Sequence, residues 1–252
     1  MKRTLLLSLF ALFLTLSYAQ PYIVGHRGSQ WGVENTAEAL ISGAQQGYHY
    51  LECDIKVAAD GTIVLSHDDN THRLGGSLTV SNSTLAQLQS ETYTQTRGGI
   101  TYTGTICTLA EYLDICAEHN VLPLIELKWA TGINSNDQSG IPALVELIEA
   151  KGFRNKCIIL TSMKPCLEYL RTHYPDIALQ HLAWKYSRKN FRWCKQWHIN
   201  ADIHHSALNR RIIRRYHNAD LLINTWTINN FTALQKYAEM GCDFITTDNL
   251  QP

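Results

Sequence analysis

The stretch from residue 52 to residue 69 concentrates residue types that can do chemistry. Glu52 and Asp54 stand two positions apart at the start of a β-rich run, and a second short run leads to His67 and Asp68. Side chains at i and i+2 of a strand point to one face, so the two carboxylates share a face. Carboxylate oxygens suit a hard divalent cation, and a histidine beside them can carry a proton.

An Asp60-Gly61 pair separates the two runs and predicts a β-hairpin. If the turn holds only these two residues, Ala59 faces Thr62 and the register carries back to Asp54 opposite His67. Directly opposed residues lie on the same face of a sheet, so Glu52, Asp54 and His67 are predicted to share one face. A slip of one residue would separate them.

Further candidate residues stand at the ends of other short apolar runs. They are His26 and Arg27, Glu126 and Lys128, His204 and His205, and Trp226. Acids inside strands are uncommon, since a buried carboxylate must be paired or bind a metal. Glu52, Asp54 and Glu126, without a Cys or His cluster, favour one divalent cation, Ca²⁺ or Mg²⁺, over zinc. The alternative is a set of structural ion pairs with Arg27 and Lys128.

The remaining candidates suggest a pocket for an anionic substrate. Arg27 and Lys128 would form its positive side, and His26 with His67 would donate and accept protons. Trp226 is a candidate for lining the pocket. The remaining aromatic and histidine candidates are expected to be structural; they are Trp184, Trp193, Trp197, His204 and His205.

The chain alternates short apolar strands with amphipathic helices, close to eight times. This alternation predicts an α/β fold with a parallel sheet covered by helices. The mature length is near that of a TIM (β/α)8 barrel, and no glycine-rich dinucleotide turn follows the first strand. We therefore expect residues 20–252 to form one barrel domain. The polar stretch 70–105 is expected to be a loop with a short helix near 84–88.

Residues 1–19 have the pattern of a secretory signal peptide. Lys2 and Arg3 precede an apolar run, and Ser17-Tyr18-Ala19 supplies small residues for cleavage after Ala19. Export to the periplasm or the medium is therefore expected, without stable membrane insertion. The formal net charge of zero gives no field for nucleic acid, and the arginines of 210–215 are expected to form a solvated helix face. The seven cysteines are expected to be mostly small buried residues.

In order along the chain, several motifs resemble those of the glycerophosphodiester phosphodiesterase family. They are Gly25-His26-Arg27-Gly28, Glu34-Asn35-Thr36, Glu52-Cys53-Asp54-Ile55, Asp60-Gly61 with His67-Asp68, Thr108-Leu109-Ala110-Glu111, Glu126-Leu127-Lys128, Trp226-Thr227-Ile228-Asn229 and Thr247-Asp248. The resemblance covers nearly the whole mature chain. It implies a TIM-barrel, metal-dependent hydrolase that cuts glycerophosphodiesters into glycerol phosphate and an alcohol.

The resemblance also implies roles for individual residues. Glu52, Asp54 and Glu126 match the metal ligands, His26 and His67 the acid/base pair, and Arg27 and Lys128 the phosphate contacts. Glu34 matches a supporting residue grouped with the substrate-binding set. Three other functions are possible for such a barrel: a phospholipase or sphingomyelinase D-like enzyme acting on intact lipid, a non-catalytic binding protein, and a metal-dependent sugar isomerase or amidohydrolase. The oligomeric state does not follow from the sequence.

Overall fold

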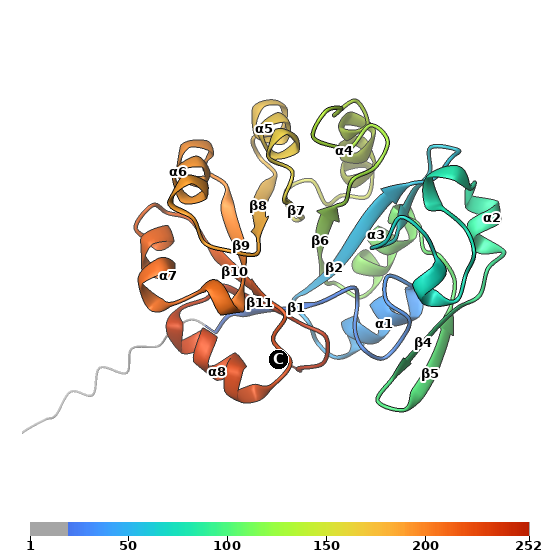
Figure 1. The fold of residues 1–252 in the computed structure, drawn as a ribbon, viewed down its shortest axis with the longest axis horizontal. Helices are drawn as coiled ribbons and strands as arrows, with labels where there is room; N and C mark the ends of the chain where they lie inside the picture. Colours follow the sequence, from blue (N-terminus) through green and yellow to red (C-terminus); the bar gives the residue numbers. More distant parts are fainter. Residues whose placement is uncertain (1–19, 252) are drawn as a thin grey trace, which may run out of the picture.

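Eight parallel strands close into a barrel in the computed structural model, which describes residues 20–251 (Figure 1). The strands are β1 (Tyr22–Gly25), β2 (Tyr50–Val57), β6 (Leu122–Leu127), β7 (Ile158–Thr161), β8 (Ala178–Ala183), β9 (Asn200–His204), β10 (Ile223–Trp226) and β11 (Phe244–Thr247). Each strand pairs with the next, and β1 closes the barrel by pairing with both β11 and β2. The predicted (β/α)8 fold is confirmed.

Helices connect the strands and cover the outside of the barrel (Figure 1). They are α1 (Ala37–Gln45), α3 (Leu109–Glu118), α4 (Ile141–Ala150), α5 (Lys164–His173), α6 (Arg188–Trp197), α7 (Arg210–His217) and α8 (Phe231–Met240). Side-chain caps explain several starts: Thr108 forms a capping box with Glu111, and Asn209 accepts from two backbone N–H groups of α7.

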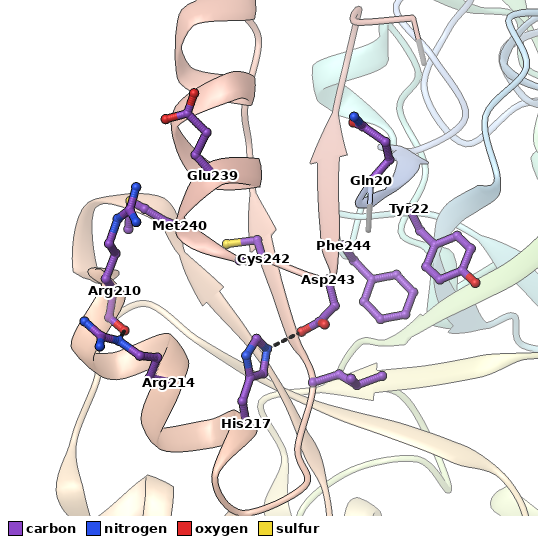
Figure 2. A pocket seen from close by; sticks show the side chains of 12 residues that line it. Gln20, Tyr22, Arg210, Arg214, His217, Glu239, Met240, Cys242, Asp243 and Phe244 are labelled. Atoms are coloured by element: carbon purple, nitrogen blue, oxygen red, sulfur yellow. Dashed lines mark hydrogen bonds and ion pairs between the residues drawn. The ribbon is translucent and has the colours of Figure 1, made fainter. Parts of the chain in front are cut away.

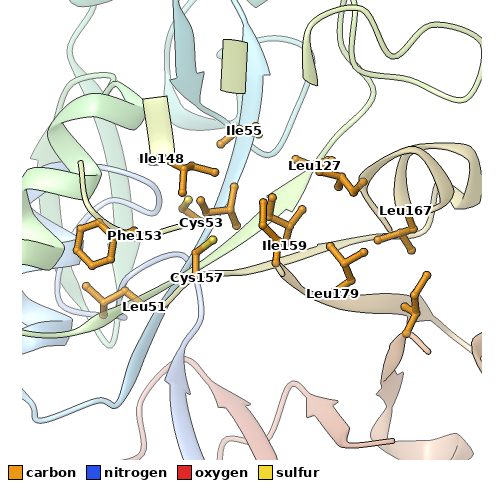
Figure 3. Close-up of a cluster of buried hydrophobic side chains, with 14 of the residues drawn as sticks. Leu51, Cys53, Ile55, Leu127, Ile148, Phe153, Cys157, Ile159, Leu167 and Leu179 are labelled. Carbon is orange, nitrogen blue, oxygen red and sulfur yellow. The ribbon is translucent and has the colours of Figure 1, made fainter. Parts of the chain in front are cut away.

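The main core lies between the barrel and the helices. In β2, Leu51, Cys53 and Ile55 point outward into this layer, where they pack with residues such as Ile148 and Ile159 (Figure 3). Because side chains alternate along a strand, Glu52 and Asp54 must point to the inside of the barrel. All seven cysteines are buried and free, which confirms their expected packing role.

A small lobe interrupts the alternation between β2 and α3. It contains strand β3 (Ile63–Leu65), two 3-10 turns (His72–Leu74 and Val80–Asn82), helix α2 (Leu85–Gln89) and the hairpin β4 (Tyr93–Arg97) with β5 (Ile100–Gly104). The lobe has its own apolar cluster, which includes Val33, Val80 and Leu88. The short helix was predicted, but the β4–β5 hairpin was not, because its Thr-rich strands carry few apolar residues.

The predicted register of the first hairpin is wrong by one residue. Strands β2 and β3 pair with Ile55 opposite Leu65, and Ser66, not His67, bonds to the Asp54 carbonyl. The turn holds three residues instead of two, with Gly61 in the left-handed region at φ +83°. The extra residue is accommodated because the Asp60 carboxylate accepts from the N–H groups of Thr62 and Leu85.

No helix within residues 20–251 is long and apolar enough to cross a membrane. The predicted signal peptide, residues 1–19, lies outside the described residues.

Candidate functional site

The candidate residues gather at the end of the barrel where the strands finish, which we call the mouth. His26 and Arg27 follow β1, Lys128 follows β6, and Trp226 ends β10. Together with Glu52, Glu126 and His67 they line one cavity of about 330 Å³. Loops at this end of a TIM barrel carry the active site.

Three carboxylates form the centre of the site, and we call them the acidic trio: Glu52, Asp54 and Glu126. Strand β2 pairs with β6 in a register that places Asp54 beside Glu126. One oxygen from each carboxylate lies within 4.8 Å of the other two. Oε1 of Glu52 is buried and has no hydrogen-bond partner among residues 20–251.

Arg27 and Lys128 place two positive charges against the acidic trio. Lys128 Nζ lies 2.7 Å from Glu126 Oε1 and 3.1 Å from Asp54 Oδ1. Arg27 Nε lies 3.2 Å from Asp54 Oδ2, and the Arg27 backbone N–H donates to Glu52 Oε2 at 2.8 Å. The ion pairs expected as the alternative to a metal site are therefore present. They leave one Glu52 oxygen unsatisfied, so they do not complete the cluster.

Asn35 holds Asp54 in place from behind. Its Nδ2 donates to Asp54 Oδ2 at 2.9 Å, and its Oδ1 accepts from the Asp54 N–H at 3.1 Å. Asn35 adopts φ +59°, a conformation that asparagine tolerates better than most residues. Thr36, not Asn35, occupies the N-cap position of α1. The role of Asn35 is to orient a carboxylate.

The electrostatics of the acidic trio are unbalanced. Burial and the neighbouring Asp54 raise the pKa of Glu126 to about 7 and that of Glu52 well above its usual range. Burial also opposes ionisation of Asp54, but Lys128 and Arg27 outweigh it and hold the Asp54 pKa low. To ionise all three buried carboxylates together, the site therefore needs more positive charge than the side chains of Arg27 and Lys128 supply. The trio, with its unsatisfied Glu52 oxygen, fits a hard divalent cation.

Each candidate histidine is oriented by a carboxylate. His26 Nδ1 lies 2.7 Å from Asp248 Oδ1, and His67 Nδ1 lies 2.7 Å from Asp68 Oδ1. A proton on each Nδ1 leaves Nε2 free to accept, which is the tautomer a general base needs. Burial lowers the pKa of His67, although Asp54 acts in the opposite direction. His67 reaches the cavity beyond the end of β3, although the register that predicted it there is wrong.

The turn that carries His26 and Arg27 depends on its glycines. A Cβ on Gly25 would lie 2.3 Å from the carbonyl oxygen of Gly28, and Gly28 itself has φ +91°. The Arg27 backbone also lies in the left-handed region, at φ 52°. This tight turn presents a His and an Arg side by side at the end of a strand.

Glu34 does not line the cavity. Its carboxylate accepts from Arg27 Nη1 at 2.8 Å and from Arg73 Nη2 at 2.6 Å, and Gln95 Nε2 donates to it at 3.0 Å. The grouping of Glu34 with the substrate-binding residues stays a prediction, and its contact with the site is through Arg27. Glu34 positions Arg27 from the side away from the cavity, and Arg73 and Gln95 belong to the lobe between β2 and α3.

Two residues of the cavity were missed. Trp184 was expected to be a packing aromatic, but it is 66% exposed and meets Trp226 edge-on at 4.6 Å between ring centroids. Asp202 lies on β9 in the cavity wall, buried, with no partner for Oδ1 among residues 20–251. Burial and Glu126 raise its pKa. Both carried usable signals, because Trp184 follows a strand end and Asp202 is an acid inside an apolar strand.

Lys128 and Trp184 also border a second, larger space. This adjoining cavity, of about 740 Å³, shares Glu126 and Leu182 with the first and extends over Trp129 and Asn190. The two cavities therefore lie next to each other, with Lys128 in the wall of both.

A separate pocket of about 460 Å³ opens at the opposite end of the barrel (Figure 2). There His217 Nε2 lies 2.9 Å from Asp243 Oδ2, and Arg214 lies on the same helix. Asp243 also accepts from the Ile223 N–H at 2.8 Å, so it ties β10 to β11. These contacts make the pocket a structural feature of the barrel base, distant from the acidic trio.

The fold and the site together define a class of protein: a (β/α)8 enzyme whose mouth pairs an acidic cluster with basic side chains and two oriented histidines. Comparisons with known proteins then give the family. The model of the glycerophosphoryl diester phosphodiesterase family matches residues 25–251. The Bacillus subtilis (strain 168) protein YhdW, named as a glycerophosphodiester phosphodiesterase, is 30% identical over 234 residues, which are 90% of this chain and 94% of YhdW.

Solved structures agree on the fold. A phosphodiesterase from Oleispira antarctica, solved with the product sn-glycerol-3-phosphate, superposes with a TM-score of 0.81 at 22% identity over 92% of this chain and 94% of its own. A glycerophosphodiester phosphodiesterase from Thermotoga maritima gives a TM-score of 0.71 at 20% identity, over 90% and 94% of the two chains. The chain belongs to the glycerophosphoryl diester phosphodiesterase family and is a phosphoric diester hydrolase.

Proposed function

We propose that the protein hydrolyses glycerophosphodiesters to sn-glycerol 3-phosphate and an alcohol, using one divalent cation, Ca²⁺ or Mg²⁺. A single observation carries the proposal. Glu52 and Glu126 of the acidic trio line one cavity with Arg27 and Lys128, with Asp54 buried beside them, and two carboxylate-oriented histidines line the same walls. The complex of the Oleispira antarctica relative with sn-glycerol-3-phosphate supports the product assignment.

The chain's own residues account for binding and proton transfer. Glu52, Asp54 and Glu126 would hold the cation, which when bound would offset the negative charge of the phosphodiester. Arg27 and Lys128 would bind phosphate oxygens, and Arg27 can do so with two parallel N–H donors. Trp226 lines the cavity beside them, and its buried Nε1 has no hydrogen-bond partner in residues 20–251.

The two histidines would divide the proton transfers. One takes the proton from the nucleophile as its oxygen forms a bond to phosphorus, and the other protonates the alcohol oxygen as the second P–O bond breaks. With water as the nucleophile, the products are glycerol phosphate and the alcohol directly. With the substrate's own glycerol 2-hydroxyl, a cyclic phosphate forms first and water then opens it. Phosphorus NMR of an early time point separates the two routes.

The function is tested by incubating the purified protein with glycerophosphocholine and a small panel of related diesters. We expect glycerol phosphate to form, and a chelator to abolish its formation until Ca²⁺ or Mg²⁺ is restored. His26→Ala and His67→Ala should each lower kcat by about 10²–10⁴-fold. His173→Ala, on the exposed side of α5, is the matched control and should leave kcat unchanged. A His67→Ala enzyme that keeps most of its turnover would contradict the assignment of His67 as an acid/base residue.

We further propose that the protein is exported and that residues 1–19 are removed. The basic start, the short apolar run and the small residues before Gln20 support this proposal. N-terminal sequencing of the protein recovered outside the cytoplasm should begin at Gln20. Recovery of the protein only from the cytoplasm, with Met1 or Lys2 first, would contradict it.

A further inference from the structure

Positive charge is concentrated in one part of the chain. Residues 177–238 contain ten Lys and Arg residues but only two acids, Asp202 and Asp220. Asp202 is buried in the barrel, so it does not offset charge at the surface. Because the whole chain has zero formal net charge, the remaining residues carry the balancing excess of acid. The surface of this protein is therefore polarised.

Helices α6 and α7 carry most of these charges, and they pack side by side. Phe191 of α6 meets Tyr216 of α7 edge-on at 5.0 Å, and the Arg215 guanidinium lies 5.9 Å from the Phe191 ring. The exposed basic residues of the two helices are Arg188, Lys189, Arg192, Lys195, Arg210, Arg211 and Arg214, and we call them the basic face. Figure 1 shows α6 and α7 as neighbours on one side of the barrel.

The basic face has no acidic partner within residues 20–251. No ion pair in this part of the chain involves a Lys or Arg of α6 or α7. Neither helix sequence contains an Asp or Glu. Surface lysines and arginines usually alternate with acids, so an unpaired set of seven is available to an external anion.

The basic face runs along the side of the barrel from the mouth, where exposed aromatic side chains also stand. It extends toward the opposite end, where Arg210 and Arg214 line the separate pocket. Helices α6, α7 and α8 begin where β8, β9 and β10 finish, so Arg188 and Arg211 lie in first turns at the mouth end. Trp184 precedes α6 and Phe231 begins α8; they are 66% and 65% exposed, the two most exposed large hydrophobic side chains in residues 20–251. Basic and aromatic residues in combination are typical of a protein surface that meets a lipid interface.

We propose that the basic face, with Phe231, docks the mouth of the barrel on an anionic phospholipid surface. The charges attract acidic head groups, and the aromatic side chains enter the interface beside them. The choice of a lipid partner rests in part on the proposed function. A glycerophosphodiester is a phospholipid without its acyl chains, so an acyl-ester hydrolase acting at a membrane must supply the substrate. Docking would hold the mouth where that product is released.

Vesicle co-sedimentation of the full protein tests the proposal. Binding is expected to vesicles containing about 30% phosphatidylglycerol in phosphatidylcholine, and not to pure phosphatidylcholine. Raising NaCl from 0.05 M to 0.5 M should release the protein, since salt screens exposed charges. Arg188→Gln/Lys189→Gln should weaken binding about 25-fold, because each surface charge contributes roughly five-fold. Phe231→Ala should weaken it further.

A matched control removes two charges elsewhere. Lys151→Gln/Lys156→Gln, between α4 and β7 at the base of the barrel, should leave vesicle binding unchanged. All of these variants should hydrolyse a water-soluble diester at the wild-type rate, because none of the substituted residues lines the cavities at the mouth. Equal weakening by the two charge pairs, or equal binding to neutral vesicles, would overturn the proposal.

Two further outcomes also test the docking proposal. Tighter binding to a single-stranded DNA oligomer than to the anionic vesicles would assign the basic face to nucleic acid instead. If no diester is cleaved but vesicle binding still depends on Arg188 and Lys189, the docking surface stands and the proposed function fails.

Discussion

Glu34 shows how one buried acid organises the side chains behind the site. It is 3% exposed and forms ion pairs with Arg27, Arg73 and Arg97. Burial alone would raise the pKa of Glu34, but the hydrogen bond from Arg73 and the charge of Arg27 lower it from 4.5 to about 2. Because the folded-state pKa is depressed, the stability that Glu34 adds is present above pH 4.5. It is lost as the pH falls towards 2.

Glu34→Gln should therefore destabilise the protein in a pH-dependent way. We expect a loss of about 2–3 kcal/mol at pH 7, reduced by the partial exposure of Arg73. The gap between wild type and variant should narrow steadily below pH 4.5, as measured by urea unfolding from pH 7 to pH 3. An unchanged gap across this range would show that the Glu34 charge does not stabilise the fold. KM should rise as well, because Arg27 loses its support.

At the scale of elements, the β2–β3 hairpin has a turn whose geometry requires a left-handed residue. Gly61 has φ +83°, and no atom beyond its two chain neighbours lies within 4 Å of a Cβ built there. Gly61→Ala should cost about 1–2 kcal/mol of unfolding free energy from backbone conformation alone. Gly61→Asn should cost less, because asparagine tolerates this region. Both can be measured by urea unfolding, and a smaller loss for Ala than for Asn would refute the conformational explanation.

The sequence predicted the barrel and most of the site because both depend on local patterns. Strand–helix alternation predicted the fold, and the position of Glu52, Asp54 and Glu126 inside apolar strands indicated a site. The register of the hairpin could not be predicted, because it depends on a hydrogen bond from Leu85, twenty-five residues after Asp60. The same limit applies to Glu34, whose partners Arg73 and Gln95 come from the lobe and are placed only by tertiary contacts.

Trp184 was misplaced for a different reason. Aromatic residues usually pack in the core, and the sequence alone does not tell a packing tryptophan from one at a cavity rim. In the structure it meets Trp226 and stacks on His204 at 5.1 Å. The exposed aromatic rim bears on the phospholipase D-like rival, since an apolar rim is what an enzyme acting on intact lipid requires.

At the scale of the whole molecule, the acidic trio connects the cation to folding. The trio joins β2 to β6, and its charge is incompletely compensated without an additional cation. Ca²⁺ or Mg²⁺ at about 100 times its Kd should raise Tm by roughly 5–10 °C, as measured by differential scanning calorimetry. Glu52→Gln/Asp54→Asn should abolish this increase. A metal-induced shift of equal size in that variant would place the cation elsewhere.

The polarised surface has a practical consequence for handling the protein. A chain with zero formal net charge is expected to pass through ion-exchange columns near neutral pH. The charged matrix of a column contacts only one face of a protein at a time. Helices α6 and α7 present seven exposed cations without an acid in either helix. The protein should therefore be retained by a cation exchanger at pH 7 in low salt and adsorb in one preferred orientation.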